Sequence, residues 1–246
     1  MSRLTLTMLC TFVGWGILFS VWPGIDLAVS AAFFDPVTGF YGDHAPFSQL
    51  LYRGIPTFSR IIIIGLICAL LIHLFMRSPQ AVKRRIQIGY LVAALILGPG
   101  LVIDAVLKSY WGRARPVQVT EFGGERQFTP ALYPARQCKD NCSFVSGHAA
   151  AGFYFVSLGF LGGPLVRRRW TLTGLFAGAI FGYGRITQGG HFLSDVVFSF
   201  YACWFSAWVM WWLFVKIGWF SNPSAPAETR QTAISTTEEP ETVDPA

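Results

Sequence analysis

Apolar residues occur in long uninterrupted stretches along most of this 246-residue chain, and they do not alternate with polar ones. Spanning the hydrocarbon core of a bilayer takes about 20 apolar residues. Four segments approach that length with at most one charged residue each, namely 4–22, 58–75, 86–107 and 192–215. The pattern predicts four membrane-spanning helices.

Two shorter, glycine-rich segments, 147–165 and 170–183, predict two more helices whose polar ends are buried in protein. The expected fold is therefore all-α: a polytopic membrane protein with a six-transmembrane-helix bundle in one domain, residues 1–220. The first stretch is longer than the apolar part of a signal peptide, and no convincing small-residue cleavage site follows it, so we interpret it as a retained helix.

Composition supports a membrane environment, because 53% hydrophobic and 13% charged residues are too apolar a mixture for an ordinary soluble domain. Segment 23–57 predicts a connection that includes a short interfacial helix. Residues 221–246 are rich in Pro, Thr, Ala and Glu, which predicts a disordered cytoplasmic tail.

Charge suggests an orientation. Segments 77–85 and 167–169 carry seven Lys/Arg residues and no acids, which predicts that they face the cytoplasm. Segment 108–146 also contains six Lys/Arg residues, although with acids, so a simple count does not settle the orientation. Cys138 and Cys142 in that segment are four apart and can close a small disulfide loop in an oxidising compartment, which favours an extracytoplasmic position.

Three polar fragments border the apolar stretches and contain the candidate chemistry. Their chemical groups are three cations, two imidazoles and one carboxylate, which suit phosphate binding, attack on phosphorus and protonation of a leaving oxygen. The fragments are Lys108 with Arg115-Pro116, Ser146-Gly147-His148, and Arg185 with His191 and Asp195.

The third fragment predicts a nucleophile. In a helix starting near His191, Asp195 lies one turn on, so its carboxylate can accept a hydrogen bond from one ring nitrogen and leave the other free to attack. Gly189 and Gly190 permit a tight turn before the helix, and Arg185 attracts a phosphate dianion. The alternative interpretation is interfacial solvation or helix capping.

The second fragment predicts a general acid. In the functional interpretation His148 protonates the leaving alkoxide, while Ser146 and the Gly147 amide bind a phosphate oxygen. The alternative is that Ser146 is simply a helix N-cap, which explains the serine but leaves the histidine unexplained.

The first fragment predicts phosphate-binding cations. Lys108 supplies a point charge and Arg115 a planar fork, a pair suited to the equatorial oxygens of a phosphoryl group in transfer. Pro116 favours an extended backbone at Arg115. Asp104, one turn before Lys108, is placed to pair with it. The alternative is contact with lipid headgroups, and we adopt that interpretation for Arg113.

The order and spacing of the fragments, Lys-x6-Arg-Pro, Ser-Gly-His and Arg-x5-His-x3-Asp over residues 108–195, resemble the type 2 phosphatidic acid phosphatase superfamily. That superfamily includes bacterial acid phosphatases and vanadium haloperoxidases. The resemblance implies a metal-independent, cofactor-free phosphatase in which His191 attacks, Asp195 orients it and His148 donates the proton. It also implies that Lys108, Arg115, Arg185, Ser146 and Gly147 hold the phosphoryl group. The chain departs from the family pattern at two positions. Val145 stands where the family usually has proline, and Gly184 stands where it commonly has serine.

Runs 111–122, 137–150 and 187–198 resemble bacterial lipid A 4′-phosphatases more closely. This implies a multi-pass protein of the bacterial inner membrane with its active site facing the periplasm. The expected partners are a lipid phosphate substrate and membrane lipids, with no nucleic acid and no obligate protein partner. Phosphatidylglycerophosphate, phosphatidate and undecaprenyl pyrophosphate are alternative substrates. A lipid phosphotransferase, a haloperoxidase and a non-catalytic phosphate-binding membrane protein are alternative functions.

Overall fold

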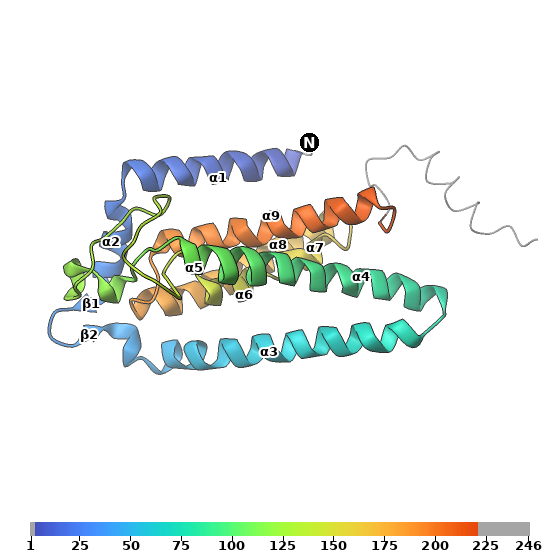
Figure 1. The fold of residues 1–246 in the computed structure, drawn as a ribbon, viewed down its shortest axis with the longest axis horizontal. Coiled ribbons are helices and arrows are strands. Elements are labelled where there is room, and N and C mark those ends of the chain that lie inside the picture. Colours follow the sequence, from blue (N-terminus) through green and yellow to red (C-terminus); the bar gives the residue numbers. More distant parts are fainter. Residues whose placement is uncertain (1–2, 221–246) are drawn as a thin grey trace, which may run out of the picture.

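The computed structural model describes residues 3–220, and most of them are helical (Figure 1). The long helices run roughly along one common direction, and the loops gather mainly at one end of the bundle. The helices are α1 (Arg3–Val21), α2 (Gly24–Ala31), α3 (Pro46–Phe75), α4 (Pro79–Leu95) with its continuations η2 (Ile96–Leu107) and α5 (Lys108–Tyr110), α6 (Gly147–Phe153), α7 (Val156–Gly159), α8 (Pro164–Thr187) and α9 (Leu193–Lys216).

The remaining elements are short. Strands β1 (Phe34–Asp35) and β2 (Gly39–Phe40) form an antiparallel hairpin in which Phe34 pairs with Phe40. Three single-turn 3-10 helices lie at Tyr41–Asp43, Pro116–Gln118 and Thr120–Phe122.

Within residues 3–220, four helices are long and apolar enough to cross a membrane: Arg3–Val21, Pro46–Phe75, Pro79–Tyr110 and Leu193–Lys216. They contain nearly all of the four predicted apolar segments. The other two predicted segments are helical over most of their length, as α6 with α7 and as α8. Six membrane spans therefore stays a prediction, and the predicted tail at 221–246 lies outside the described residues.

Some helix boundaries differ from the prediction. Helix α3 begins at Pro46, which occupies the first turn where its missing N–H costs nothing, and it continues through Pro56. The predicted 147–165 helix is instead divided into α6 and α7, which ends at Gly159 before Gly162-Gly163-Pro164. Pro164 then opens α8, in the same first-turn position.

Glycines let the central helices approach closely. A Cβ added at Gly152 on α6 would lie 2.4 Å from the backbone nitrogen of Gly178 on α8. A Cβ at Gly98 on η2 would lie 3.2 Å from the Cβ of Ser206 on α9. Small residues at such crossings are typical of helix packing in membranes.

Helix α3 exposes its apolar side chains. None of the residues in its most apolar 18-residue window is buried, and Ile61, Ile64 and Ile72 are among the exposed ones. This apolar surface suits contact with lipid.

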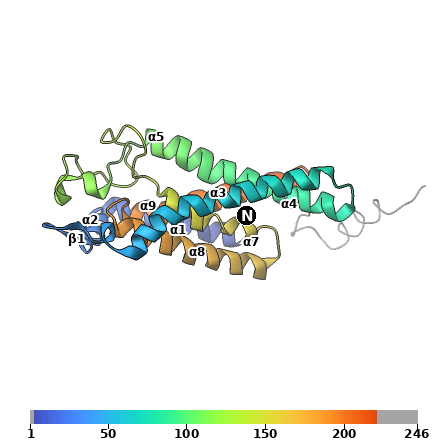
Figure 2. The ribbon, with the colours of Figure 1, turned by 90° about the horizontal axis from the view of Figure 1, so that it is seen from below.

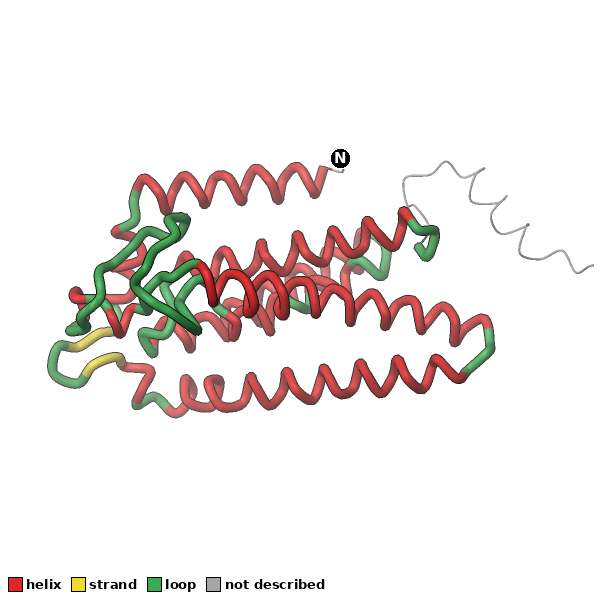
Figure 3. Tube along the Cα trace, viewed as in Figure 1, coloured by secondary structure: helices red, strands yellow, loops and turns green. Residues whose placement is uncertain are grey.

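The two ends of the bundle differ in chemistry. Most loops, together with α2 and the hairpin, lie at one end, and Figures 2 and 3 show the long 111–146 segment there. The α3–α4 turn lies at the other end (Figure 1). Lys83 and Arg167, from the two basic segments, line one cavity at that far end. The basic segments therefore share one end of the bundle and the loops that carry the polar fragments share the other.

Candidate active site

His191 lies in the turn between α8 and α9, where Gly189 has a positive φ of 61°. Its ring is 2% exposed, and Nδ1 is 2.7 Å from the backbone carbonyl oxygen of Ser143. A carbonyl oxygen only accepts, so Nδ1 carries the proton and Nε2 keeps the lone pair. The structure thus places a neutral imidazole with its nucleophilic nitrogen available.

Asp195 contacts His191 less directly than the sequence predicted. Its Oδ2 is 3.8 Å from Nδ1 of His191, beyond hydrogen-bond distance, because the helix begins at Leu193 and Oδ2 accepts from the backbone N–H of Phe192 at 2.8 Å. The Ser143 hydroxyl also donates to Oδ2, at 2.5 Å. The predicted direct hydrogen bond is therefore wrong, and Ser143 connects the two side chains through its carbonyl and its hydroxyl.

Burial lowers the pKa of His191 to about 3, against the opposing effect of Asp195. Arg185 and Arg115 act on the ring in the same direction as burial. The imidazole is consequently neutral at physiological pH, which is the protonation state that a nucleophile needs.

The sequence analysis placed Arg113 at the lipid headgroups, and that prediction is wrong. The side chain is completely buried, and its Nη1 donates to Asp195 Oδ1 at 2.6 Å and its Nη2 to Asp26 Oδ2 at 2.7 Å. The guanidinium also lies 4.3 Å from the ring centroid of Phe192. Two buried carboxylates and an aromatic ring explain why this arginine is held inside the protein.

Two arginine side chains, Arg115 and Arg185, are held at the site by hydrogen bonds and a ring contact. Arg115 has the predicted extended backbone (φ −81°, ψ 157°), and its Nη2 donates to the backbone oxygen and the Oδ1 of Asn141 at 2.8 and 2.9 Å. Arg185 donates to Gln188 Oε1 at 2.5 Å and lies over the ring of Tyr52, 4.6 Å from its centroid. Among the described residues its buried Nε has no hydrogen-bond partner, so a donor remains for a ligand.

Lys108 stands beside the start of α6. Its Nζ is 2.9 Å from Asp104 Oδ1, the predicted pair, and a Cβ added at Gly147 would lie only 2.5 Å from Nζ. The missing side chain at position 147 therefore makes room for the ammonium group.

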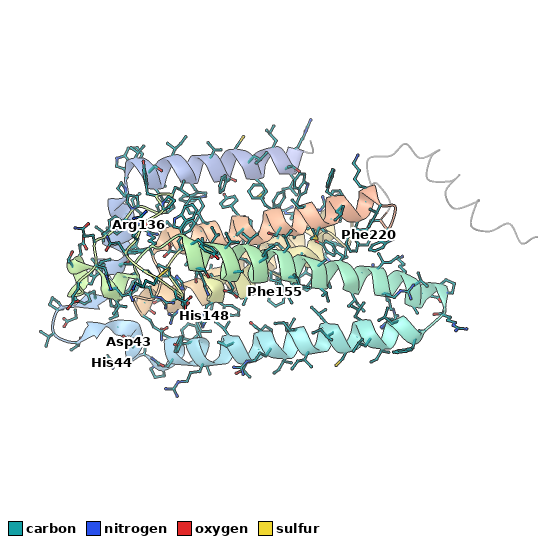
Figure 4. All side chains as sticks on the ribbon, in the orientation of Figure 1. Asp43, His44, Arg136, His148, Phe155 and Phe220 are labelled. Atoms are coloured by element: carbon teal, nitrogen blue, oxygen red, sulfur yellow. A yellow bond between two sulfur atoms is a disulfide. The ribbon has the colours of Figure 1, made fainter. Side chains whose placement is uncertain are left out.

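His148 projects from α6 toward α3 (Figure 4). Its Nε2 is 3.2 Å from the backbone oxygen of Tyr52, and the two rings are stacked with centroids 5.6 Å apart. Burial, followed by the charges of Arg185, Lys108 and Arg115, lowers the pKa of His148 to about 4, so the ring is neutral at physiological pH before a phosphate dianion offsets those charges. Because Arg115 and Arg185 also act on His191, the two imidazoles share the same pair of cations.

Ser146 is a helix N-cap. Its Oγ accepts from the backbone N–H of Ala149 at 3.4 Å, and its own N–H donates to the backbone oxygen of Asp195 at 3.2 Å. The capping interpretation is therefore confirmed, and phosphate binding by Ser146 stays a prediction.

Cys138 and Cys142 are joined by a disulfide in the loop that contains Asn141. Over residues 3–220 there is no cluster of three His, Cys, Asp or Glu side chains that could hold a metal ion.

The sequence analysis missed five polar residues around the site. Ser143 and Asn141 lie within a run that it singled out, so proximity to the second fragment was the available signal. The others reach the site only through the fold: Asp26, Tyr52 and Gln188.

Two imidazoles that share cations at one end of an apolar helical bundle are groups that suit phosphoryl transfer. Comparison with known proteins gives the family. The model of the PAP2 superfamily matches residues 87–219, and the chain belongs to this superfamily. No solved structure matches the chain.

Three curated relatives are lipid A 4′-phosphatases. The protein from Francisella tularensis subsp. novicida (strain U112) is 34% identical over 223 residues, covering 87% of this chain and 96% of the relative. The protein from Rhizobium leguminosarum is 34% identical over 211 residues, covering 77% and 88%. The protein from Rhizobium etli is 42% identical over 115 residues, covering 46% and 43%. Family and relatives together identify the chain as a phosphatase, a phosphoric monoester hydrolase.

Proposed function

We propose that this protein hydrolyses a phosphate monoester of a lipid, the 4′-phosphate of lipid A, through a phosphohistidine at His191. The observation that carries the proposal is the placement of His191 and His148 around one shared pair of arginines, with the proton of His191 fixed on Nδ1 by Ser143. The substrate is taken from the three relatives, two of which align with most of this chain.

In the first step Nε2 of His191 attacks phosphorus while the bond to the sugar oxygen breaks. His148, which gains a proton when the phosphate dianion binds beside it, gives that proton to the leaving alkoxide, so the products are the dephosphorylated lipid and an Nε2-phosphohistidine. Lys108, Arg115 and Arg185 balance the charge on the phosphoryl oxygens, assisted by the Ser146 hydroxyl and the Gly147 amide.

In the second step water attacks the phosphohistidine. His148, now neutral, accepts the proton of the water as the P–N bond breaks, and orthophosphate leaves with both histidines restored. The residues themselves perform every proton transfer, so we expect the reaction to proceed with a chelator present.

We further propose that the protein lies in the bacterial inner membrane with the site facing the periplasm. The basic segments share the end of the bundle away from the site, which favours a cytoplasmic position for that end. The disulfide at the site end suits an oxidising compartment.

The orientation can be tested by labelling single cysteines in intact cells with a membrane-impermeant maleimide. Val37→Cys, at a position 91% exposed beside the hairpin, is expected to react once the outer membrane is permeable. Arg84→Cys, at the opposite end, is expected to react only after the inner membrane is opened. The reverse pattern would contradict the orientation.

The activity can be tested with purified protein in detergent and chelator, offered lipid A, phosphatidate, phosphatidylglycerophosphate and undecaprenyl pyrophosphate. We expect phosphate release to be fastest from lipid A, and to be abolished in His191→Ala. His73→Ala is the matched control, since His73 lies near the far end of α3 and bonds only locally to Ala69. Turnover by His191→Ala at the wild-type rate would refute the nucleophile, and a faster rate on another lipid would refute the substrate.

A further inference from the structure

A buried chain of charges leads away from His191 to the N-terminal part of the protein. Asp195 on α9 binds Nη1 of Arg113, and Nη2 of the same guanidinium binds Asp26 on α2. All three side chains are at most 1% exposed. Ser194 closes the group, because its backbone N–H and its hydroxyl donate to Asp26 and its hydroxyl also accepts from Arg113.

We propose that Asp26 and Arg113 are positioning residues for the nucleophile, and that Asp26 supplies the negative charge that Arg113 would otherwise remove from Asp195. This inference rests on the proposed function of His191. In the structure neither residue contacts Arg115, Arg185 or Lys108, the cationic side chains proposed to bind the phosphate. Their influence on His191 therefore passes through Asp195 and Ser143.

The argument starts from charge. When Nε2 of His191 bonds to phosphorus it shares its lone pair, and the ring acquires positive charge in a site that is almost completely excluded from solvent. An isolated Arg113–Asp195 pair has no net charge and would stabilise such a cation poorly. With Asp26 the group carries one net negative charge, which favours the cationic ring.

The hydrogen bonds indicate an ionised network, because both oxygens of Asp26 accept: Oδ1 from the Ser194 N–H, and Oδ2 from the Ser194 hydroxyl and from Arg113. Burial lowers the pKa of Arg113, but Asp195 and Asp26 outweigh that effect and raise the pKa above its ordinary value. Burial and the nearby charge of Asp195 raise the pKa of Asp26, and Arg113 and the Ser194 hydroxyl act against that rise. The arginine is charged at every physiological pH, so it neutralises one of its two carboxylates and leaves the other uncompensated.

Geometry supplies a second role. Arg113 also donates from Nε to the backbone oxygen of Thr129 at 2.9 Å, so the guanidinium is fixed in four directions. A lysine has no planar fork and cannot bridge two carboxylates in this way. Arg113 thereby holds Asp195 where its Oδ2 accepts a hydrogen bond from the Ser143 hydroxyl. That bond fixes Ser143, whose carbonyl oxygen accepts from Nδ1 of His191.

Asp26→Asn tests the proposal, because it removes the charge and keeps the size and one accepting oxygen. We expect the rate of phosphoenzyme formation, measured by rapid quench with labelled lipid A, to fall roughly 10- to 100-fold, the range for partners that act through another residue. The inhibition constant for vanadate is expected to stay within about threefold of wild type, since Asp26 does not touch the phosphate. Asp35→Asn, at an exposed aspartate of the hairpin, is the control.

Two further variants separate charge from scaffolding. Asp26→Glu retains the charge and is expected to be faster than Asp26→Asn. In Asp26→Asn with Arg113→Gln the network returns to one net negative charge, so this double variant, where it folds, is expected to regain part of the rate that the single variant lost. A purely structural role predicts that the double variant is slower than either single one.

An Asp26→Asn rate within threefold of wild type would overturn the proposal. So would a loss of rate matched by an equal loss of vanadate affinity, or Asp26→Glu no faster than Asp26→Asn. Failure of the proposed function would look different: wild-type protein would form no phosphoenzyme from any of the lipids, whatever residue occupies position 26.

Discussion

Gly147→Ala is a demanding test of how the site holds Lys108. The added Cβ would lie 2.5 Å from Lys108 Nζ, 3.1 Å from its Cε and 3.4 Å from Asp104 Oδ1. Ordinary van der Waals contact begins near 3.4 Å, so the ammonium group must move by about 1 Å or more. The backbone at 147 is helical, and alanine is no worse than glycine there, so folding should not suffer.

A misplacement of about 1 Å at a reacting centre can cost roughly 100-fold in rate. We therefore expect Gly147→Ala to lower kcat/KM for the lipid phosphate by about 100-fold, equivalent to about 2.7 kcal/mol of transition-state stabilisation. Phosphate release in detergent measures the rate, and thermal unfolding followed in the same detergent measures stability.

The matched control is Gly89→Ala on α4, where an added Cβ meets nothing within 4 Å. Both variants should unfold within a few degrees of wild type, and only Gly147→Ala should lose activity. Activity of Gly147→Ala within threefold of wild type would refute the view that the ammonium group acts from the position seen here. A large drop in its unfolding temperature would refute the claim that the substitution is local.

Three further predictions concern other groups of the site. The His191 ring is expected to show no titration between pH 5 and 8 in histidine-selective NMR, because its pKa is lowered to about 3. The contribution of the neutral ring to folding stability is present above about pH 6.5 and is lost as the pH falls toward 3. A titration midpoint near 6.5 would contradict this prediction. His148→Gln is expected to slow lipid hydrolysis by about 10²- to 10⁴-fold, and to slow a phosphate ester with a good leaving group much less, whereas equal losses would argue against a general acid. Asn141→Ala is expected to raise KM more than it lowers kcat, because Arg115 loses its Oδ1 partner while its own charge remains; an unchanged KM would argue that Arg115 is held by other groups.

The sequence predicted best what local signals determine. Apolar length identified the four helices that can span a membrane, and Gly189 and Gly190 correctly marked the turn in front of His191. Ser146 was a plausible N-cap from its position alone, and the structure confirms that role. Each of these features depends on residues close together in the chain.

The sequence analysis assigned Arg115 to phosphate and Arg113 to lipid headgroups, and nothing near Arg113 in the chain shows that it is buried between two carboxylates. What distinguishes the two arginines is a carboxylate 87 residues away, Asp26, which binds Arg113 only after α2 has packed near the start of α9. The hydrogen bond from His191 to the Ser143 carbonyl, 48 residues apart, was equally invisible, because it uses a backbone oxygen that every residue possesses. The early start of α3 at Pro46 was missed because residues 46–57 are less apolar than the stretch that follows.

Trapping the covalent intermediate tests the central claim most directly. Purified protein is mixed with lipid A carrying labelled 4′-phosphate, quenched in alkali within the first turnover, digested and analysed by mass spectrometry. The account predicts an alkali-stable, acid-labile phosphoryl group on His191, absent from His191→Ala and still formed by His73→Ala. Label on another residue, or full turnover with no labelled protein at any time, would contradict it.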